Sequence, residues 1–74
     1  LMACKYRNSG QTCISANRIF VQNKVYDEFS EKLVNRVKGI KVGNGFEPGV
    51  TQGPLINEQG FKKVCSLVDD ALSK

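Results

Sequence analysis

The chain has 74 residues, about half of a typical domain, and a folded chain of this size buries only about 60% of the surface that it exposes when unfolded. Hydrophobic residues make up 41% and charged residues 24%, which excludes collagen and intrinsic disorder. The net charge is +4, but the basic residues are spread from Lys5 to Lys74 among acidic ones, with no run longer than Lys62-Lys63. No apolar stretch approaches the roughly 20 residues of a membrane span. We therefore expect no nucleic-acid partner and no membrane span.

The N-terminal part is predicted to contain a helix end, a turn and a strand. Apolar side chains within residues 1–8 are consistent with the last turns of a helix, and the small polar run that includes Gly10 predicts a turn. Residues 18–22 form a β-branched and aromatic run, typical of a buried strand in a mixed or parallel sheet.

The remainder is predicted to form two helices separated by a short strand and a loop. Residues 25–38 place their apolar side chains on one helical face. Residues 40–42 are predicted as a short strand, and residues 43–54, with four glycines and two prolines, as an ordered loop. Asn57 is a good N-cap for a final helix. The order strand, helix, short strand, loop, helix indicates an α/β fold.

Both ends suggest a piece of a longer protein. The chain begins with Leu1, and its first residues do not resemble a signal peptide. The helical spacing of apolar residues in the final helix continues up to the end of the chain at Lys74. We expect residues 1–74 to be one structural unit truncated at both ends.

Cys13 is the position where the local sequence looks most suited to chemistry. It follows the predicted turn, and Lys5, Arg7 and Arg18 are near it in sequence. Positive charge favours the thiolate, which is the nucleophilic form, whereas an ordinary thiol is only about 3% ionised at pH 7. The pattern alone leaves two interpretations open for Cys13, a catalytic nucleophile and a buried structural cysteine.

The other two cysteines, Cys4 and Cys65, lie among apolar positions, and core packing is the expectation for both. The chain has no histidine and no C-x-x-C pair, so no metal site is predicted. The odd cysteine count favours a reducing compartment over secretion.

Residues 5–13, Lys-Tyr-Arg-Asn-Ser-Gly-Gln-Thr-Cys, closely resemble the active-site cysteine signature of the aldehyde dehydrogenase family, centred on Gly-Gln-x-Cys. The similarity continues through residues 17–22, 26–29, 42–44 and 52–58, so it covers nearly the whole chain. The resemblance implies that residues 1–74 belong to the doubly wound, Rossmann-like catalytic domain of such an enzyme. It also implies a homo-oligomeric parent protein.

Within the family, this stretch looks most like the succinate-semialdehyde dehydrogenase branch. Those enzymes use an arginine six residues before the nucleophile to hold the substrate's carboxylate, and Arg7 occupies that position. A guanidinium binds a carboxylate through two parallel charge-assisted hydrogen bonds, which would hold the aldehyde end over the thiol. The other interpretation of Arg7 is an ordinary surface cation.

The resemblance implies a mechanism in which Cys13 attacks the aldehyde carbon to give a thiohemiacetal. Its oxyanion is stabilised by the Cys13 N–H and an asparagine, hydride passes to NAD or NADP, and a glutamate activates the water that hydrolyses the thioester. In the family, that asparagine and glutamate precede the cysteine, outside these 74 residues. We therefore expect the isolated chain to be inactive.

Two positions depart from the family pattern. Many members of this branch have a second cysteine two residues after the nucleophile, able to form a redox-switch disulfide, where this chain has Ser15. The family often has a glutamine and then a lysine near the cofactor's ribose; Gly60 replaces the glutamine, but Lys63 matches the lysine and is predicted as a cofactor contact. The expected compartment is the cytosol or the mitochondrial matrix.

Two other classes of function stay open at this stage. A small basic binding module would bind nucleic acid with a steep salt dependence. A thiol redox module would need a resolving partner for Cys13, for which Cys4 is the nearest cysteine.

Overall fold

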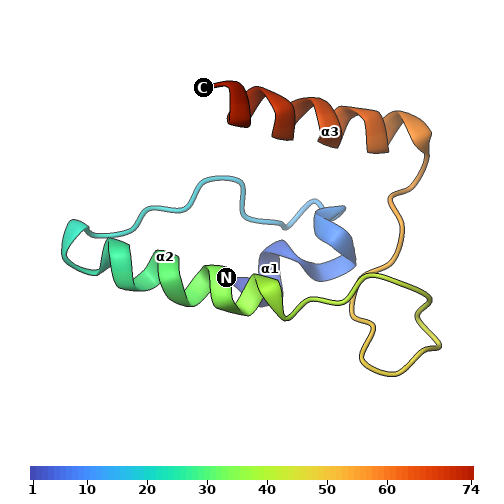
Figure 1. Cartoon of the computed structure of the whole chain (residues 1–74), viewed down its shortest axis with the longest axis horizontal. Coiled ribbons are helices and arrows are strands. Elements are labelled where there is room, and N and C mark those ends of the chain that lie inside the picture. The colour runs from blue at the N-terminus through green and yellow to red at the C-terminus, as the bar shows by residue number, and fades with distance from the viewer.

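The computed structural model describes all 74 residues as helices joined by long loops (Figure 1). The elements are α1 (Met2–Lys5), the 3₁₀ turn η1 (Arg7–Gly10), α2 (Asn23–Lys38) and α3 (Glu58–Ser73). The short α1 packs against α2, whereas α3 contacts no other helix. No helix is both long enough and apolar enough to span a membrane.

The two predicted long helices are confirmed. α2 begins two residues earlier than expected and ends at Lys38, where the Gly39 N–H donates to the Arg36 carbonyl at 3.2 Å and the Ile40 N–H to the Val37 carbonyl at 3.0 Å. α3 begins directly after Asn57, whose side chain accepts a hydrogen bond of 2.8 Å from the Gly60 N–H, as an N-cap does. Glu58 lies in the first turn, near the positive end of the helix dipole.

The predicted strands are not confirmed, so the α/β pattern is corrected for these residues. Residues 18–22 have no regular secondary structure and no ladder partner, and the Phe20 side chain is 93% exposed. In the 40–42 segment, only Val42 pairs, in one isolated parallel bridge with Gln52. A strand forms only by backbone pairing with a neighbouring strand, and residues 18–21 form no backbone hydrogen bond within this chain.

The chain has no buried core. No residue is buried, and the accessible surface is 6694 Å², whereas a compact monomer of this length would expose about 4,500 Å². The radius of gyration is 14.0 Å, against about 11 Å for a compact domain. The apolar faces of α2 and α3 are therefore left largely uncovered.

This openness corrects the expectation for two cysteines. Cys4 and Cys65 are exposed, as is Cys13, and all three thiols are free. Core packing was predicted from their apolar neighbours, but no second layer covers those neighbours within the chain.

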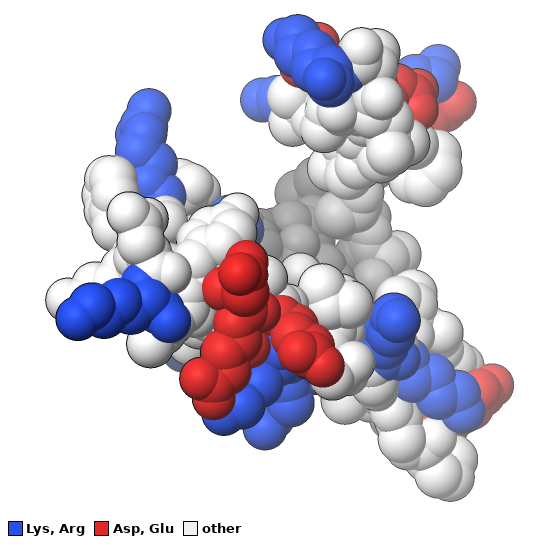
Figure 2. Space-filling view, turned by 60° about the vertical axis from the view of Figure 1, so that its left-hand side comes forward, with Lys and Arg blue, Asp and Glu red and all other residues white.

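Charged side chains of both signs are interspersed over the face shown in Figure 2. Three Lys–carboxylate pairs at i,i+4 spacing, within or at the end of α2 and α3, are Lys32–Glu28, Lys62–Glu58 and Lys74–Asp70, with N···O distances of 2.8, 3.3 and 3.1 Å. All six side chains are mostly exposed, so each pair contributes little to stability.

Candidate active site

The segment before Cys13 is a tight turn built on left-handed backbone. The Ser9 N–H donates to the Tyr6 carbonyl at 3.1 Å. Asn8, Ser9 and Gly10 follow one another with φ values of 52°, 57° and 79°. The predicted turn at Gly10 is thus confirmed, and a Cβ there would meet the Lys5 carbonyl oxygen at 3.1 Å. Left-handed conformation is uncommon outside glycine, so contacts beyond the turn must hold it in place.

Gln11 fastens this turn to a distant loop. Its Nε2 donates to the Asn8 carbonyl at 3.0 Å, and its Oε1 accepts from the Ile56 N–H at 2.8 Å. The Asn8 side chain returns a hydrogen bond to the Gln11 carbonyl at 3.2 Å. The backbone two residues before Cys13 is therefore fixed against the loop that leads into α3.

Cys13 is exposed and lines an open pocket of about 590 Å³. One side of this pocket, called the thiol pocket below, comes from residues 8 and 11–13 and the other from Pro54, Leu55 and Ile56. The thiol forms no hydrogen bond or disulfide, and the Cys13 N–H donates to no acceptor within the chain. The position thus offers an accessible thiol together with a free backbone donor.

Arg7 lies in a different pocket from Cys13. It is exposed, takes part in no ion pair, and lines an open pocket of about 640 Å³ together with Arg36 from α2. No aspartate or glutamate lines this arginine pocket. Asn8 lines both pockets, so they adjoin, but the structure does not bring the guanidinium and the thiol into one cavity.

Lys63 is placed apart from both pockets. It is exposed on α3, forms no ion pair and lines none of the four pockets. The residues of this chain do not form a dinucleotide site by themselves, because no pocket brings Lys63 together with the glycines of the loop that precedes α3. No group of three or more His, Cys, Asp or Glu side chains gathers in a way that could hold a metal ion.

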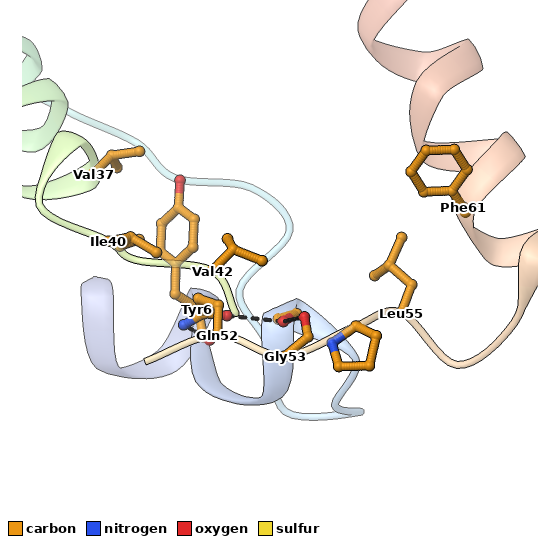
Figure 3. A pocket seen from close by; sticks show the side chains of 10 residues that line it. Tyr6, Val37, Ile40, Val42, Gln52, Gly53, Leu55 and Phe61 are labelled. Carbon is orange, nitrogen blue, oxygen red and sulfur yellow. Dashed lines mark hydrogen bonds between the residues drawn. The ribbon is translucent and has the colours of Figure 1, made fainter. Parts of the chain in front are cut away.

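A third, apolar pocket of about 540 Å³ lies between the N-terminal turn and α3 (Figure 3). Tyr6, Val37, Ile40 and Val42 form one side, while Leu55 and Phe61 lie on the other.

Gln52 lines both this apolar pocket and the arginine pocket, and sequence reasoning gave its side chain no role. Its partners are more than 40 residues away in the chain, a separation that no local pattern reports.

Comparison with known proteins agrees with the signature at Cys13. A profile of the aldehyde dehydrogenase family matches residues 1–74. A Sinorhizobium fredii protein named as a probable NADP(+) succinate-semialdehyde dehydrogenase is 56% identical over 95% of this chain and 14% of its own length. A glutarate-semialdehyde dehydrogenase of Pseudomonas putida is also 56% identical, over 95% of this chain and 15% of its own length.

The fold is likewise similar to part of a solved structure. The crystal structure of an aldehyde dehydrogenase from Brucella melitensis biovar abortus 2308 matches 97% of this chain and 15% of that chain, with a TM-score of 0.89 and 58% identity. The chain belongs to the aldehyde dehydrogenase family. It spans about one seventh of the length of the relatives that it matches.

Proposed function

We propose that residues 1–74 form part of the catalytic domain of a longer enzyme, called the parent below. The parent is an NAD(P)-dependent aldehyde dehydrogenase that oxidises succinate semialdehyde, or a similar aldehyde with a distal carboxylate, to the acid. The observation that carries this proposal is the exposed Cys13 thiol, which lies within the family's signature. It directly follows a turn that Gln11 holds against Ile56. The three free thiols favour a reducing compartment, the cytosol or the mitochondrial matrix.

Cys13 acts as the nucleophile in this proposal. Its thiolate adds to the aldehyde carbon, a carbon–sulfur bond forms, and the carbonyl electron pair moves onto oxygen. The Cys13 N–H, which has no acceptor within the chain, is available to that oxyanion. NAD(P)+, when bound, supplies the hydride acceptor, and Lys63 remains a proposed contact to it although no pocket in this chain includes that residue.

Arg7 holds the substrate's carboxylate. Its guanidinium has no carboxylate partner in the chain, and the neighbouring Arg36 adds a second positive charge to the same pocket. A site with two guanidinium groups and no acid favours an anion. Two relatives are named for succinate and glutarate semialdehydes, which supports an aldehyde carrying a carboxylate at its far end.

Steady-state kinetics of the parent test these roles, with succinate semialdehyde and the uncharged four-carbon aldehyde butanal as substrates. We expect Cys13→Ala to abolish NAD(P)+ reduction with both aldehydes. Arg7→Ala should raise KM for succinate semialdehyde at least tenfold and change KM for butanal little, because only succinate semialdehyde has a carboxylate for Arg7 to bind.

Arg18→Ala is the matched control, since Arg18 is also an exposed arginine without an ion pair but lines none of the pockets. It should leave both KM values unchanged. If the parent prefers butanal and Arg7→Ala has no effect, the substrate assignment is wrong. If no aldehyde is oxidised, the enzymatic assignment of Cys13 is wrong as well.

A further inference from the structure

One side chain, that of Gln52, contacts both ends of the turn that carries Arg7. Residues 6–9 form the turn, with Arg7 and Asn8 at its two central positions, and the only backbone hydrogen bond that closes it runs from the Ser9 N–H to the Tyr6 carbonyl at 3.1 Å. Gln52 adds a second link across the same ends. Its Nε2 donates to the Tyr6 carbonyl and its Oε1 accepts from the Ser9 hydroxyl, both at 2.9 Å.

Both hydrogen-bonding groups of the Gln52 amide are used, and both contacts are partly buried. The Tyr6 carbonyl therefore accepts two hydrogen bonds, from Ser9 and from Gln52, and so uses both of its lone pairs. Figure 3 shows Gln52 beside Tyr6. The Ser9 hydroxyl also lies 3.3 Å from the Gly53 carbonyl, which brings the neighbouring residue of the same loop against the turn.

Gln52 is itself held by the segment that follows α2. Its N–H donates to the Lys41 carbonyl at 3.2 Å, and its carbonyl accepts from the Gly43 N–H at 3.1 Å, the two bonds of the parallel bridge with Val42. The amide thus extends from a backbone fixed on both sides, so it can hold the turn in one place rather than follow its motion.

The left-handed backbone at Asn8 and Ser9 is the feature of the turn that needs stabilising contacts. Two consecutive non-glycine residues at positive φ are disfavoured and persist only where surrounding contacts over-determine them. Without Gln52, one backbone hydrogen bond, the 3.3 Å contact of the Ser9 hydroxyl with the Gly53 carbonyl and the local Asn8–Gln11 contacts would remain to keep this turn in place.

We propose that Gln52 is a positioning residue for Arg7, which sets the affinity of the enzyme for carboxylate-bearing aldehydes by fixing both ends of the turn that presents the guanidinium. This inference rests on the proposed carboxylate-binding role of Arg7. In this inference Gln52 acts through its hydrogen bonds to the Tyr6 carbonyl and the Ser9 hydroxyl.

The test uses the full-length parent with the substitution Gln52→Met. Methionine has a similar length but removes both amide contacts, and it adds no charge to the arginine pocket that Gln52 lines. We expect KM for succinate semialdehyde to rise about fivefold, because the turn that presents Arg7 loses both Gln52 contacts, with less than a twofold change in KM for butanal and in kcat for either aldehyde.

Two further variants separate this role from a general loss of structure. Ser9→Gly removes the hydroxyl contact while keeping a residue that tolerates a φ of 57°, and it should raise KM for succinate semialdehyde in the same selective way. Gln59→Met makes the same chemical change at an exposed position of α3 whose side chain forms no hydrogen bond, and it should change neither KM.

The outcomes distinguish this inference from the proposed function. If Arg7→Ala raises KM for succinate semialdehyde but Gln52→Met and Ser9→Gly do not, the positioning role is wrong and the carboxylate site stands. If Gln52→Met lowers kcat equally for both aldehydes, Gln52 supports the fold or Cys13 instead, which also overturns the inference. If Arg7→Ala itself has no effect, both proposals fail.

Discussion

At the scale of single residues, backbone conformation places the candidate nucleophile. The run of positive φ from Asn8 to Gly10 turns the chain, and Gln11 then fastens it to Ile56 before Cys13 follows. Only Gly10 in this run could be predicted from sequence, because glycine is the residue that readily adopts this conformation. The Asn8 side chain contacts only the nearby Gln11 carbonyl, whereas Ser9 is held by Gln52 and Gly53, more than 40 residues along the chain, and no local pattern reveals those contacts.

Gly10→Ala in the parent tests the importance of this backbone. The new Cβ would combine an unfavourable φ of 79° with a 3.1 Å approach to the Lys5 carbonyl oxygen, so we expect a loss of about 1–3 kcal/mol in the free energy of unfolding and a lower kcat. Denaturant unfolding and steady-state kinetics measure the two effects. Gly45→Ala is the matched control, because no atom lies within 4 Å of its Cβ and its φ is not positive. Equal effects at the two glycines would contradict this account.

At the scale of elements, the sequence predicts the two long helices correctly, whereas the predicted strands do not form within this chain. Periodicity and capping are local properties, so the sequence predicted α2 to within two residues and identified Asn57 as the cap of α3. The run at residues 18–22 has strand composition, but strand formation depends on a neighbour that supplies hydrogen bonds, and this chain provides none there. The candidate site shows the same difference between local and long-range features. The sequence predicted Cys13 and Arg7 from a local motif, but not the hydrogen bonds of Gln52 to Tyr6 and Ser9, which are more than 40 residues away.

α3 contacts no other helix, so its formation depends on its own sequence and can be tested in a peptide of residues 55–74. Asn57→Ala removes the side-chain acceptor of the Gly60 N–H, and we expect the helix to lose about 1 kcal/mol of stability. Circular dichroism at low temperature should show a clear fall in helix content.

Gly60→Ala should act in the opposite direction in the same peptide. Its Cβ would meet Asn57 Oδ1 at 3.4 Å and Ile56 Cγ2 at 3.7 Å, both tolerable contacts, and alanine is favoured over glycine in a helix by up to about 1 kcal/mol. Unchanged helix content in the Asn57→Ala peptide would show that Asn57 is not the effective cap, and a fall in the Gly60→Ala peptide would show that the Cβ is not tolerated.

At the scale of the whole molecule, polar contacts rather than a hydrophobic core position the candidate site. The long-range side-chain hydrogen bonds of Ser9, Gln11 and Gln52 join its two loops, while the apolar faces of α2 and α3 stay largely uncovered. Polar contacts at such an exposed junction contribute only modestly to stability, and hydrophobic burial is the term that normally offsets conformational entropy. The chain therefore depends on further apolar surface to make this arrangement stable.

The isolated 74-residue chain should accordingly lack a cooperative fold. With no buried residue to lose, its thermal and urea denaturation curves, followed by circular dichroism, should change gradually rather than in a sigmoidal transition. All three cysteines should react with a thiol reagent in the absence of denaturant, because each is exposed in the chain. The isolated chain should also fail to reduce NAD(P)+ in the presence of succinate semialdehyde, since none of its pockets fits a dinucleotide. A sigmoidal transition with slowly exchanging amides, or a thiol that reacts only after denaturation, would show that the chain folds more compactly than its exposed surface of 6694 Å² indicates.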